Sequence, residues 1–337
     1  MSPSSHATPA GERRVWGLDI GGTKIGICIG NAAGEVLASE RFPAASLDPR
    51  AALEQALARL RALQALHPGE TPLALGVACP GPMSSREGRF LDPPNMPAWH
   101  RFAVREELLR LGAPHVRLMN DANAGALAES LWGAARDAAT SVFFTMSTGM
   151  GAGLVIGGRL YEGPDDLAGE IGHLRLDPDG PVGFGKRGSV EGYLSGPGLV
   201  QLGEAEARIA RQRGETTRLW PLAQDHPRFD AEDLCRAAAS GDPAAKRATD
   251  RAADALGRLM ALLTDLLNPD VFVLGTIGSA YPELFLPGAR AVLEREALPR
   301  AVERLKILPS TLGAERGMKQ ALAAALFGYG ELHQHTR

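Results

Sequence analysis

Two glycine-rich turns between apolar strands contain the residues whose types and spacing most plainly indicate chemistry. One turn lies in VWGLDIGGTKIGICIG (15–30) and the other in FFTMSTGMGAGLVIGGRLYEG (143–163). A phosphate tail carries charged oxygens but little surface for side chains to cover, so proteins often bind it with backbone N–H groups in tight turns. Glycine lets the backbone come close and adopt φ > 0. Two matched turns therefore predict one phosphate-bearing ligand held from two sides.

Side chains in both turns fit this hypothesis. The Thr23 hydroxyl can donate a hydrogen bond, Lys24 adds positive charge, and Asp19 can hold a water on Mg²⁺. Neither turn is a Walker A loop or a GxGxxG motif entering a helix, because a strand follows each. Taken one at a time, each turn is equally well interpreted as an ordinary hairpin turn. The candidate phosphate-binding residues are Asp19, Gly21, Gly22, Thr23 and Lys24 in the first turn and Ser147, Thr148 and Gly149 in the second.

Asp121 is the candidate catalytic residue. The pattern of HVRLMNDANAGALAESLWG (115–133) predicts a strand to about Met119 and a helix from about Ala122. Asn120 and Asp121 then lie at the carboxyl end of a strand, where ligands bind in open α/β sheets. A kinase that acts on an alcohol needs a carboxylate to orient the hydroxyl and accept its proton. The alternative is that Asn-Asp before a helix is an N-cap, the commoner role of these residues taken alone.

The remaining sequence predicts the elements that position these residues. A third strand extends the first hairpin into a β-meander, and an alternation of helices and strands follows. The segment 163–197 is irregular, glycine-rich and longer than an ordinary connecting loop, which indicates a function. The expected elements are a strand at 35–42, a helix at 48–66, a strand at 73–79, helices at 198–213, 231–240 and 243–267, a strand with a glycine turn at 270–278, a strand at 304–310 and a closing helix at 315–328.

Composition limits the class of protein and its partners. With 337 residues, 45% of them hydrophobic, the chain can bury a large core and form two domains. A net charge of −3 gives no electrostatic reason to expect nucleic acid or a membrane surface as partner. The three cysteines lie far apart and form no CxxC motif, and no apolar run is long enough to span a membrane. We therefore expect a cytoplasmic protein that binds small molecules, with a disordered leader at 1–13.

Seven motifs together resemble the ROK family (repressor, open reading frame, kinase), which includes bacterial glucokinases, fructokinases and N-acetylhexosamine kinases. They are DIGGTK, PGPM with PNMPAW, MNDANAGALAE, STGMGAG, GEIGH, GSVEGYLSG and NPDVFVLGTIG, in the family's order and approximate spacing. The resemblance covers the chain from about Gly17 to the closing helix. It implies an α/β, two-domain actin/hexokinase-like (ribonuclease H-like) ATPase fold with the active site in the interdomain cleft. The smaller domain would comprise 14–118 with 316–337, and the larger 119–315.

The resemblance also implies a role for each motif residue. Asp121 would be the general base. Gly275 would lie by the nucleoside, although the family more often has three consecutive glycines where this chain has Gly-Thr-Ile-Gly. The sugar hydroxyls would be bound by Asn95, Asn120, Asp121, Glu170, His173 and Glu191, and the nucleotide by Gly22, Thr23, Lys24, Thr148 and Gly149.

The chain departs from the family at its zinc-binding segment. The usual CxCGxxGCxE reads VGFGKRGSVE here (182–191), with Val182, Phe184 and Ser189 at the cysteine positions. Zn²⁺ needs about four N, S or O ligands, and valine and phenylalanine offer none. We expect no structural zinc, with Val182 and Phe184 packing where the metal tied the loop in relatives. His173 would then keep its contact with the sugar.

The leading functional hypothesis is an ATP- and Mg²⁺-dependent hexose kinase that converts glucose to glucose 6-phosphate, with Asp121 as the base. Other acceptors left open are N-acetylmannosamine, N-acetylglucosamine and fructose, and polyphosphate is an alternative donor. A sugar-responsive repressor needs a DNA-binding module, and only about a dozen residues precede the first turn. A non-catalytic sugar sensor is the remaining class. A homodimer is expected from the family.

Overall fold

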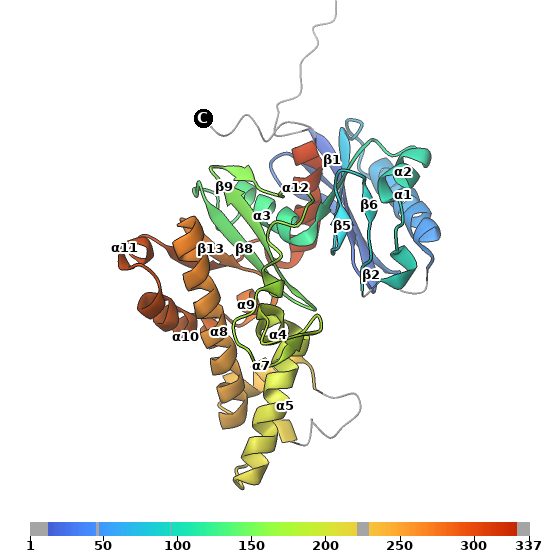
Figure 1. Cartoon of the computed structure of the whole chain (residues 1–337). Coiled ribbons are helices and arrows are strands. Elements are labelled where there is room, and N and C mark those ends of the chain that lie inside the picture. Colours follow the sequence, from blue (N-terminus) through green and yellow to red (C-terminus); the bar gives the residue numbers. More distant parts are fainter. Residues whose placement is uncertain (1–12, 45–46, 95, 221–228, 329–337) are drawn as a thin grey trace, which may run out of the picture. The chain divides into compact units, whose positions relative to one another are not determined.

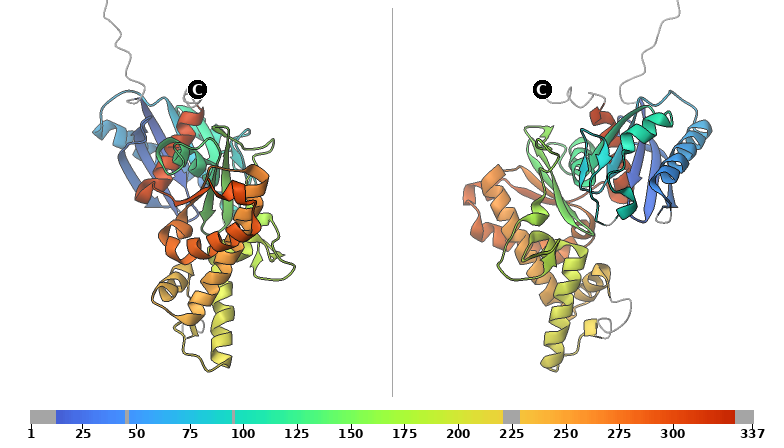
Figure 2. Two further views of the ribbon diagram at one scale, coloured as in Figure 1. Left: turned by 90° about the vertical axis from the view of Figure 1, so that its left-hand side faces the viewer. Right: turned by 45° about the vertical axis from the view of Figure 1, so that its right-hand side comes forward.

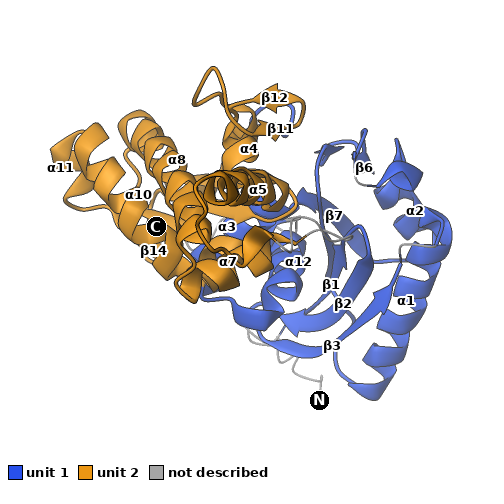
Figure 3. Ribbon diagram, turned by 90° about the horizontal axis from the view of Figure 1, so that it is seen from below, with its two compact units in different colours: residues 1–136, 162–167, 311–337 blue, residues 137–161, 168–310 orange. Residues whose placement is uncertain are grey.

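The computed structural model describes residues 13–44, 47–94, 96–220 and 229–328 (Figure 1). The predicted leader up to residue 12 and the predicted sugar ligand Asn95 lie outside these ranges. Contacts divide the chain into two compact units (Figure 3). Unit 1 comprises residues 1–136, 162–167 and 311–337, and unit 2 comprises 137–161 and 168–310. Asn120 and Asp121 thus group with the N-terminal strands, whereas the sequence analysis assigns them to the larger domain.

Unit 1 is built on a five-stranded sheet of order β3-β2-β1-β4-β7. The first three strands form the predicted antiparallel meander, and β4 and β7 then run parallel to β1. Parallel strands place their carboxyl ends at one edge of the sheet, so residues that end β1 and β7 share that edge. The strands are β1 (Arg14–Ile20), β2 (Lys24–Asn31), β3 (Val36–Pro43), β4 (Ala74–Cys79) and β7 (His115–Asn120).

Helices cover both faces of this sheet (Figures 1 and 2). Alternate residues of β1 point to opposite faces, so Leu18 packs into the cluster formed with α1 (Pro49–Leu66) and α2 (Val104–Arg110), whereas Val15 packs with α12 (Arg316–Gly328). The face toward α12 is lined by glycines because the helix comes very close. A Cβ on Gly76 would lie 2.0 Å from the carbonyl oxygen of Ala321.

Unit 2 repeats the same strand topology with the order β10-β9-β8-β13-β14. An antiparallel meander of β8 (Ser141–Met146), β9 (Met150–Ile156) and β10 (Arg159–Leu160) is followed by two strands parallel to β8, namely β13 (Val271–Leu274) and β14 (Lys306–Pro309). The two glycine turns noted in the sequence are therefore equivalent connections, one in each unit, between the first two strands of each sheet.

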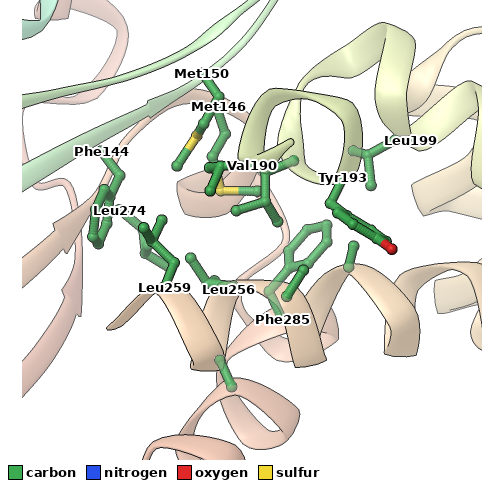
Figure 4. Packing of buried hydrophobic residues seen from close by; sticks show 14 of the residues in the cluster. Phe144, Met146, Met150, Val190, Tyr193, Leu199, Leu256, Leu259, Leu274 and Phe285 are labelled. Atoms are coloured by element: carbon green, nitrogen blue, oxygen red, sulfur yellow. The ribbon is translucent and has the colours of Figure 1, made fainter. Parts of the chain in front are cut away.

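Long helices supply most of the unit 2 core. The helices that contribute are α5 (Gly196–Gln212), α7 (Ala231–Ala239), α8 (Pro243–Leu267) and α10 (Pro282–Glu296). Phe285 of α10 and Leu256 of α8 are fully buried, and they pack in one cluster with Met146 and Met150, the residues that flank the second glycine turn (Figure 4). The turn is thus mounted on a rigid, close-packed base.

Most predicted elements are confirmed, since their apolar periodicity matches the burial found in the structure. α8 spans the predicted 243–267, and its Asp242 N-cap accepts hydrogen bonds from the amides of Ala244 and Ala245. One prediction needs correction: Gly275 does not open a simple turn after β13. It occupies the N-cap position of a short helix, α9 (Thr276–Ala280). Thr276 adopts φ 46°, and its hydroxyl donates a hydrogen bond to the Met146 carbonyl.

The irregular segment 163–197 contains short elements. They are the 3₁₀ turn η3 (Ile171–His173), the two-stranded β11 (Val182–Gly183) and β12 (Lys186–Arg187), and α4 (Val190–Leu194). No helix within the described ranges is long and apolar enough to cross a membrane.

Candidate active site

The first glycine turn is closed by a hydrogen bond from the Gly21 amide to the Lys24 carbonyl oxygen, at 3.0 Å. Gly22, Thr23 and Lys24 are exposed, so their backbone and side-chain donors are open to a ligand. Neither Gly21 nor Gly22 adopts the left-handed conformation expected of turn glycines. Glycine is instead favoured at Gly21 by space, because a Cβ there would lie 3.1 Å from the Lys24 carbonyl oxygen.

Asp19 lies on the face of β1 that packs against α12. Its Oδ2 atom would be 2.2 Å from a Cβ on Gly317, so the carboxylate lies directly over the first turn of that helix. Burial raises the pKa of the Asp19 carboxyl, and the positive charges of Arg41 and Arg316 oppose that rise. A carboxylate held in this way beside a phosphate turn has the chemistry of a ligand for Mg²⁺ or for its bound water.

Arg316 is a residue that the sequence analysis did not identify. It begins α12 and is half-buried, and burial lowers its pKa while the carboxylates of Glu129, Asp19 and Asp121 oppose that shift. The guanidinium therefore adds positive charge beside both candidate acidic residues. Its position depends on the packing of a C-terminal helix against an N-terminal sheet, so no local sequence motif could have predicted a role for Arg316.

The structure assigns the N-cap role, which the sequence left open for the Asn-Asp pair, to Asn120. Asn120 is the N-cap of α3 (Asp121–Trp132), and its Oδ1 accepts from the amide of Ala122 at 2.9 Å and more weakly from that of Asn123 at 3.4 Å. Asp121 is the first residue of the helix and is not the cap. Asn120 directs its acceptor toward the helix, which leaves the amide Nδ2 as the group that can donate to a ligand.

Asp19 and Asp121 lie at the same edge of the unit 1 sheet. Asp19 pairs with Ala78 near the end of β4, and Cys79, the last residue of β4, pairs with Asn120. The pKa of the Cys79 thiol is raised well above its usual value, first by burial and then by the charges of Asp121 and Asp19. β1 and β7 are separated only by β4, which corresponds to about 10 Å between their backbones.

The second glycine turn brings a candidate sugar ligand beside the candidate phosphate site. The amide of Met150 donates to Oε2 of Glu191 at 3.2 Å, and a Cβ on Gly149 would lie 3.0 Å from the same oxygen. The turn itself is closed by a 2.9 Å bond from the Ser147 amide to the Gly149 carbonyl, and Thr148 is exposed. Gly149, like Gly21, does not have positive φ, so it is favoured by the approach of Glu191.

Glu170 and His173 lie close to Glu191 in unit 2. The GEIGH segment lies directly on β9, where a Cβ on Gly172 would be 2.3 Å from the Met150 carbonyl oxygen. Loss of water raises the pKa of the Glu170 carboxyl, nearby His173 opposes the rise, and the Glu191 carboxylate adds to it. Two carboxyl groups and an imidazole thus face one region, which suits recognition of a polyhydroxylated ligand.

Gly275 packs against the strand that leads into the second turn. Its amide donates to the Phe144 carbonyl at 2.8 Å, and a Cβ there would lie 2.5 Å from the Phe143 ring. Thr148, Gly149 and Gly275 therefore all belong to the β8 end of unit 2. The predicted nucleotide-binding residues divide into this set and the Asp19–Lys24 set of unit 1.

The residues at the family's zinc positions do not fit a zinc ion. Val182 is 40% exposed and Phe184 61% exposed, while Ser189 is buried and N-caps α4. The expectation that Val182 packs into the space of the metal is wrong, since its side chain faces solvent. Phe184 does pack, although on the imidazole of His173. The thiols of Cys28, Cys79 and Cys235 are buried elsewhere, so no thiolate can reach this segment.

Comparison with known proteins identifies the family to which the chain is similar. The ROK family profile matches residues 15–326. Glucokinase of Halalkalibacterium halodurans is 30% identical over 315 residues, which cover 91% of this chain and 93% of the relative. N-acetylmannosamine kinase of Shigella boydii is 31% identical over 319 residues, covering 93% and 98%.

A solved structure is similar to the chain in both fold and sequence. The ROK family glucokinase of Streptomyces griseus, determined with glucose and AMPPNP, superposes with a TM-score of 0.75 at 28% identity, over 93% of this chain and 99% of that one. The family match extends across both sheets and every described candidate site residue. The chain therefore belongs to the ROK family and has the actin/hexokinase-like α/β fold of that family's sugar kinases.

Proposed function

We propose that this ROK-family sugar kinase transfers the γ-phosphoryl group of ATP to a hexose, with glucose as the leading acceptor and glucose 6-phosphate as the product. The position of Glu191 carries the proposal. Its carboxylate accepts a hydrogen bond from the amide that follows the second glycine turn, and its charge also acts on Glu170 of the GEIGH segment. A residue shared by a phosphate turn and a sugar-binding motif is what a phosphotransferase requires.

The residues divide the work of phosphoryl transfer between them. Asp121, at the start of α3, orients the acceptor hydroxyl and takes its proton. Asn120 donates from Nδ2 to a neighbouring sugar hydroxyl, while Glu170, His173 and Glu191 bind the others. This mechanism requires the Asn120–Asp121 pair and the three other sugar-binding residues to bind the same sugar molecule in the working enzyme.

Charge on the phosphates is balanced by backbone amides of the two glycine turns and by the cations of unit 1. Lys24 is exposed at the first turn, and Arg316 supplies a half-buried guanidinium beside Asp19 and Asp121. Asp19 would hold Mg²⁺ directly or through water, and the bound ion would neutralise charge on the phosphate oxygens. Such positioning and charge stabilisation supply most of the catalysis in phosphoryl transfer.

The identity of the sugar acceptor is the most specific part of the proposal. Glucokinases and N-acetylmannosamine kinases are similar to this chain at nearly the same identity, so identity does not separate a C2 hydroxyl from an N-acetyl group. We take glucose first because a glucokinase solved with glucose shares the fold. N-acetylmannosamine, N-acetylglucosamine and fructose are the competing acceptors, and polyphosphate is the competing donor.

We further propose that the enzyme works in the cytoplasm as a homodimer. The three cysteines, Cys28, Cys79 and Cys235, are free thiols buried in the structure, which suits a reducing compartment. Light scattering of the purified protein tests the dimer, since a mass of one 35.6 kDa chain would refute it.

The direct test of function is ADP release from MgATP against glucose, fructose, mannose, N-acetylglucosamine and N-acetylmannosamine, with Asp121→Asn as the inactive control. Turnover with one sugar that vanishes in the variant supports the kinase and identifies its acceptor. A second series with polyphosphate replaces ATP. Sugar binding by calorimetry without turnover in either series would favour the non-catalytic sensor.

A further inference from the structure

A short hairpin at 182–189, hereafter the 182–189 hairpin, replaces the metal-binding segment of the family. β11 and β12 pair Val182 with Arg187, and Phe184 lies at the tip beside Gly185. The ring of Phe184 lies 4.8 Å from the imidazole of His173, centroid to centroid, with an interplanar angle of 68°. This edge-to-face geometry is the one that aromatic pairs prefer.

Hydrogen bonds hold the hairpin in place without a metal. Gln201 of α5 accepts from the amide of Val182 at 2.9 Å and donates to its carbonyl at 2.8 Å. The buried Ser189 hydroxyl lies 3.1 Å from the Lys186 carbonyl and accepts from the amide of Gly192. The Lys186 ammonium donates to the carbonyl oxygen of His173 itself, at 2.7 Å.

Core packing does not explain the presence of phenylalanine at position 184. The residue has φ 47°, a left-handed conformation that glycine adopts readily and bulky residues adopt rarely. It is also 61% exposed, so it gains little from burial. A large side chain that is both strained and exposed is a candidate for function. The one aromatic contact that the ring makes within the described residues is with His173.

We propose that Phe184 is a positioning residue that sets the orientation of the His173 imidazole for sugar binding, with Lys186 fixing the His173 backbone, so that this pair replaces the structural metal. The inference rests on the proposed function, in which His173 binds a sugar hydroxyl. Phe184 itself touches the imidazole and no reacting atom. The hairpin then makes sugar binding independent of any metal at this position.

The test compares three variants of the 182–189 hairpin. Phe184→Gly removes the ring and also relieves the positive φ, whereas Phe184→Tyr keeps the ring. Val182→Ala is the matched control, because Val182 belongs to the same hairpin, is exposed and is held through its backbone. Stability and sugar binding should therefore change independently.

We expect Phe184→Gly to keep or raise Tm while KM for glucose rises about two- to tenfold with little change in kcat, the range of an aromatic pair. Phe184→Tyr and Val182→Ala should retain the original KM. An unchanged KM in Phe184→Gly, or an equal rise in Val182→Ala, would overturn the proposal. Stoichiometric zinc in chelator-washed protein would overturn it as well.

A spectroscopic arm distinguishes failure of this inference from failure of the proposed function. The imidazole C–H signals of His173, assigned by their loss in His173→Gln, are followed by NMR in protein without sugar. The ring current of Phe184 should shift them, and the shift should disappear in Phe184→Gly but persist in Phe184→Tyr. Signals that do not move in Phe184→Gly refute the positioning role. That result would hold whether or not the enzyme phosphorylates glucose.

Discussion

Replacing Asp121 with asparagine separates a catalytic base from a helix-capping residue. The side chain keeps its size but loses the ability to accept a proton. Asn120 remains as the N-cap of α3, so the hydrogen bonds at the helix start are retained. Loss of the negative charge in the first helical turn should cost about 0.3–1 kcal/mol of stability.

The expected effect on catalysis is much larger. Removal of a general base lowers kcat by about 10²–10⁴, which corresponds to about 2.7–5.4 kcal/mol in the barrier. The assay follows ADP release at saturating sugar and MgATP, and thermal unfolding is followed on the same preparations. We expect Tm to fall by no more than about 2–4 °C, the shift per kcal/mol for chains of this size.

Two variants of Asn120 complete the comparison. Asn120→Ala removes the cap and should cost about 1 kcal/mol of stability. Asn120→Asp keeps an oxygen that accepts from the helix amides and replaces the Nδ2 donor with a carboxylate oxygen, so stability should hold while KM for the sugar rises. If Asp121→Asn retains more than about a tenth of kcat, Asp121 is a structural residue and the proposed base lies elsewhere.

Three further outcomes follow from the structure. Because its pKa is raised above the usual 4.5, Glu170 takes up a proton at a higher pH than an ordinary glutamate, so sugar KM should rise on acidification before ordinary glutamates titrate. Glu170→Gln should abolish this acidic rise in KM, and a rise that persists in the variant argues against Glu170. Arg316→Met should raise KM for MgATP and raise the pKa of Asp19 further, measured by pH profiles, whereas unchanged nucleotide kinetics would exclude a phosphate role. Phe285→Ala should lower the unfolding free energy of unit 2 by about 3–5 kcal/mol in denaturant titrations, and a loss below about 1 kcal/mol would contradict its close packing.

The local sequence determined most of the elements and predicted the places where ligands bind. Apolar periodicity and a proline at the start were enough to place α8, and the Asn120-Asp121 pair marked the junction between β7 and α3. These features depend on neighbours within a few residues, so they can be predicted without the fold. The two glycine turns were recognised in the same way, and the structure places them at equivalent positions in two sheets of the same topology.

Only the tertiary structure decided what surrounds those places. The charge of Arg316, from the last helix, acts on Asp19 of the first strand. Glu191 belongs to α4 and lies beside Gly149 in the turn between β8 and β9. The same packing explains the turn glycines, which are favoured by close approach and not by positive φ. Contacts of this kind join residues distant in the chain, and no local pattern records them. Long-range packing of helices on sheets therefore decided which charged groups lie at the candidate site and how closely they approach the glycine turns.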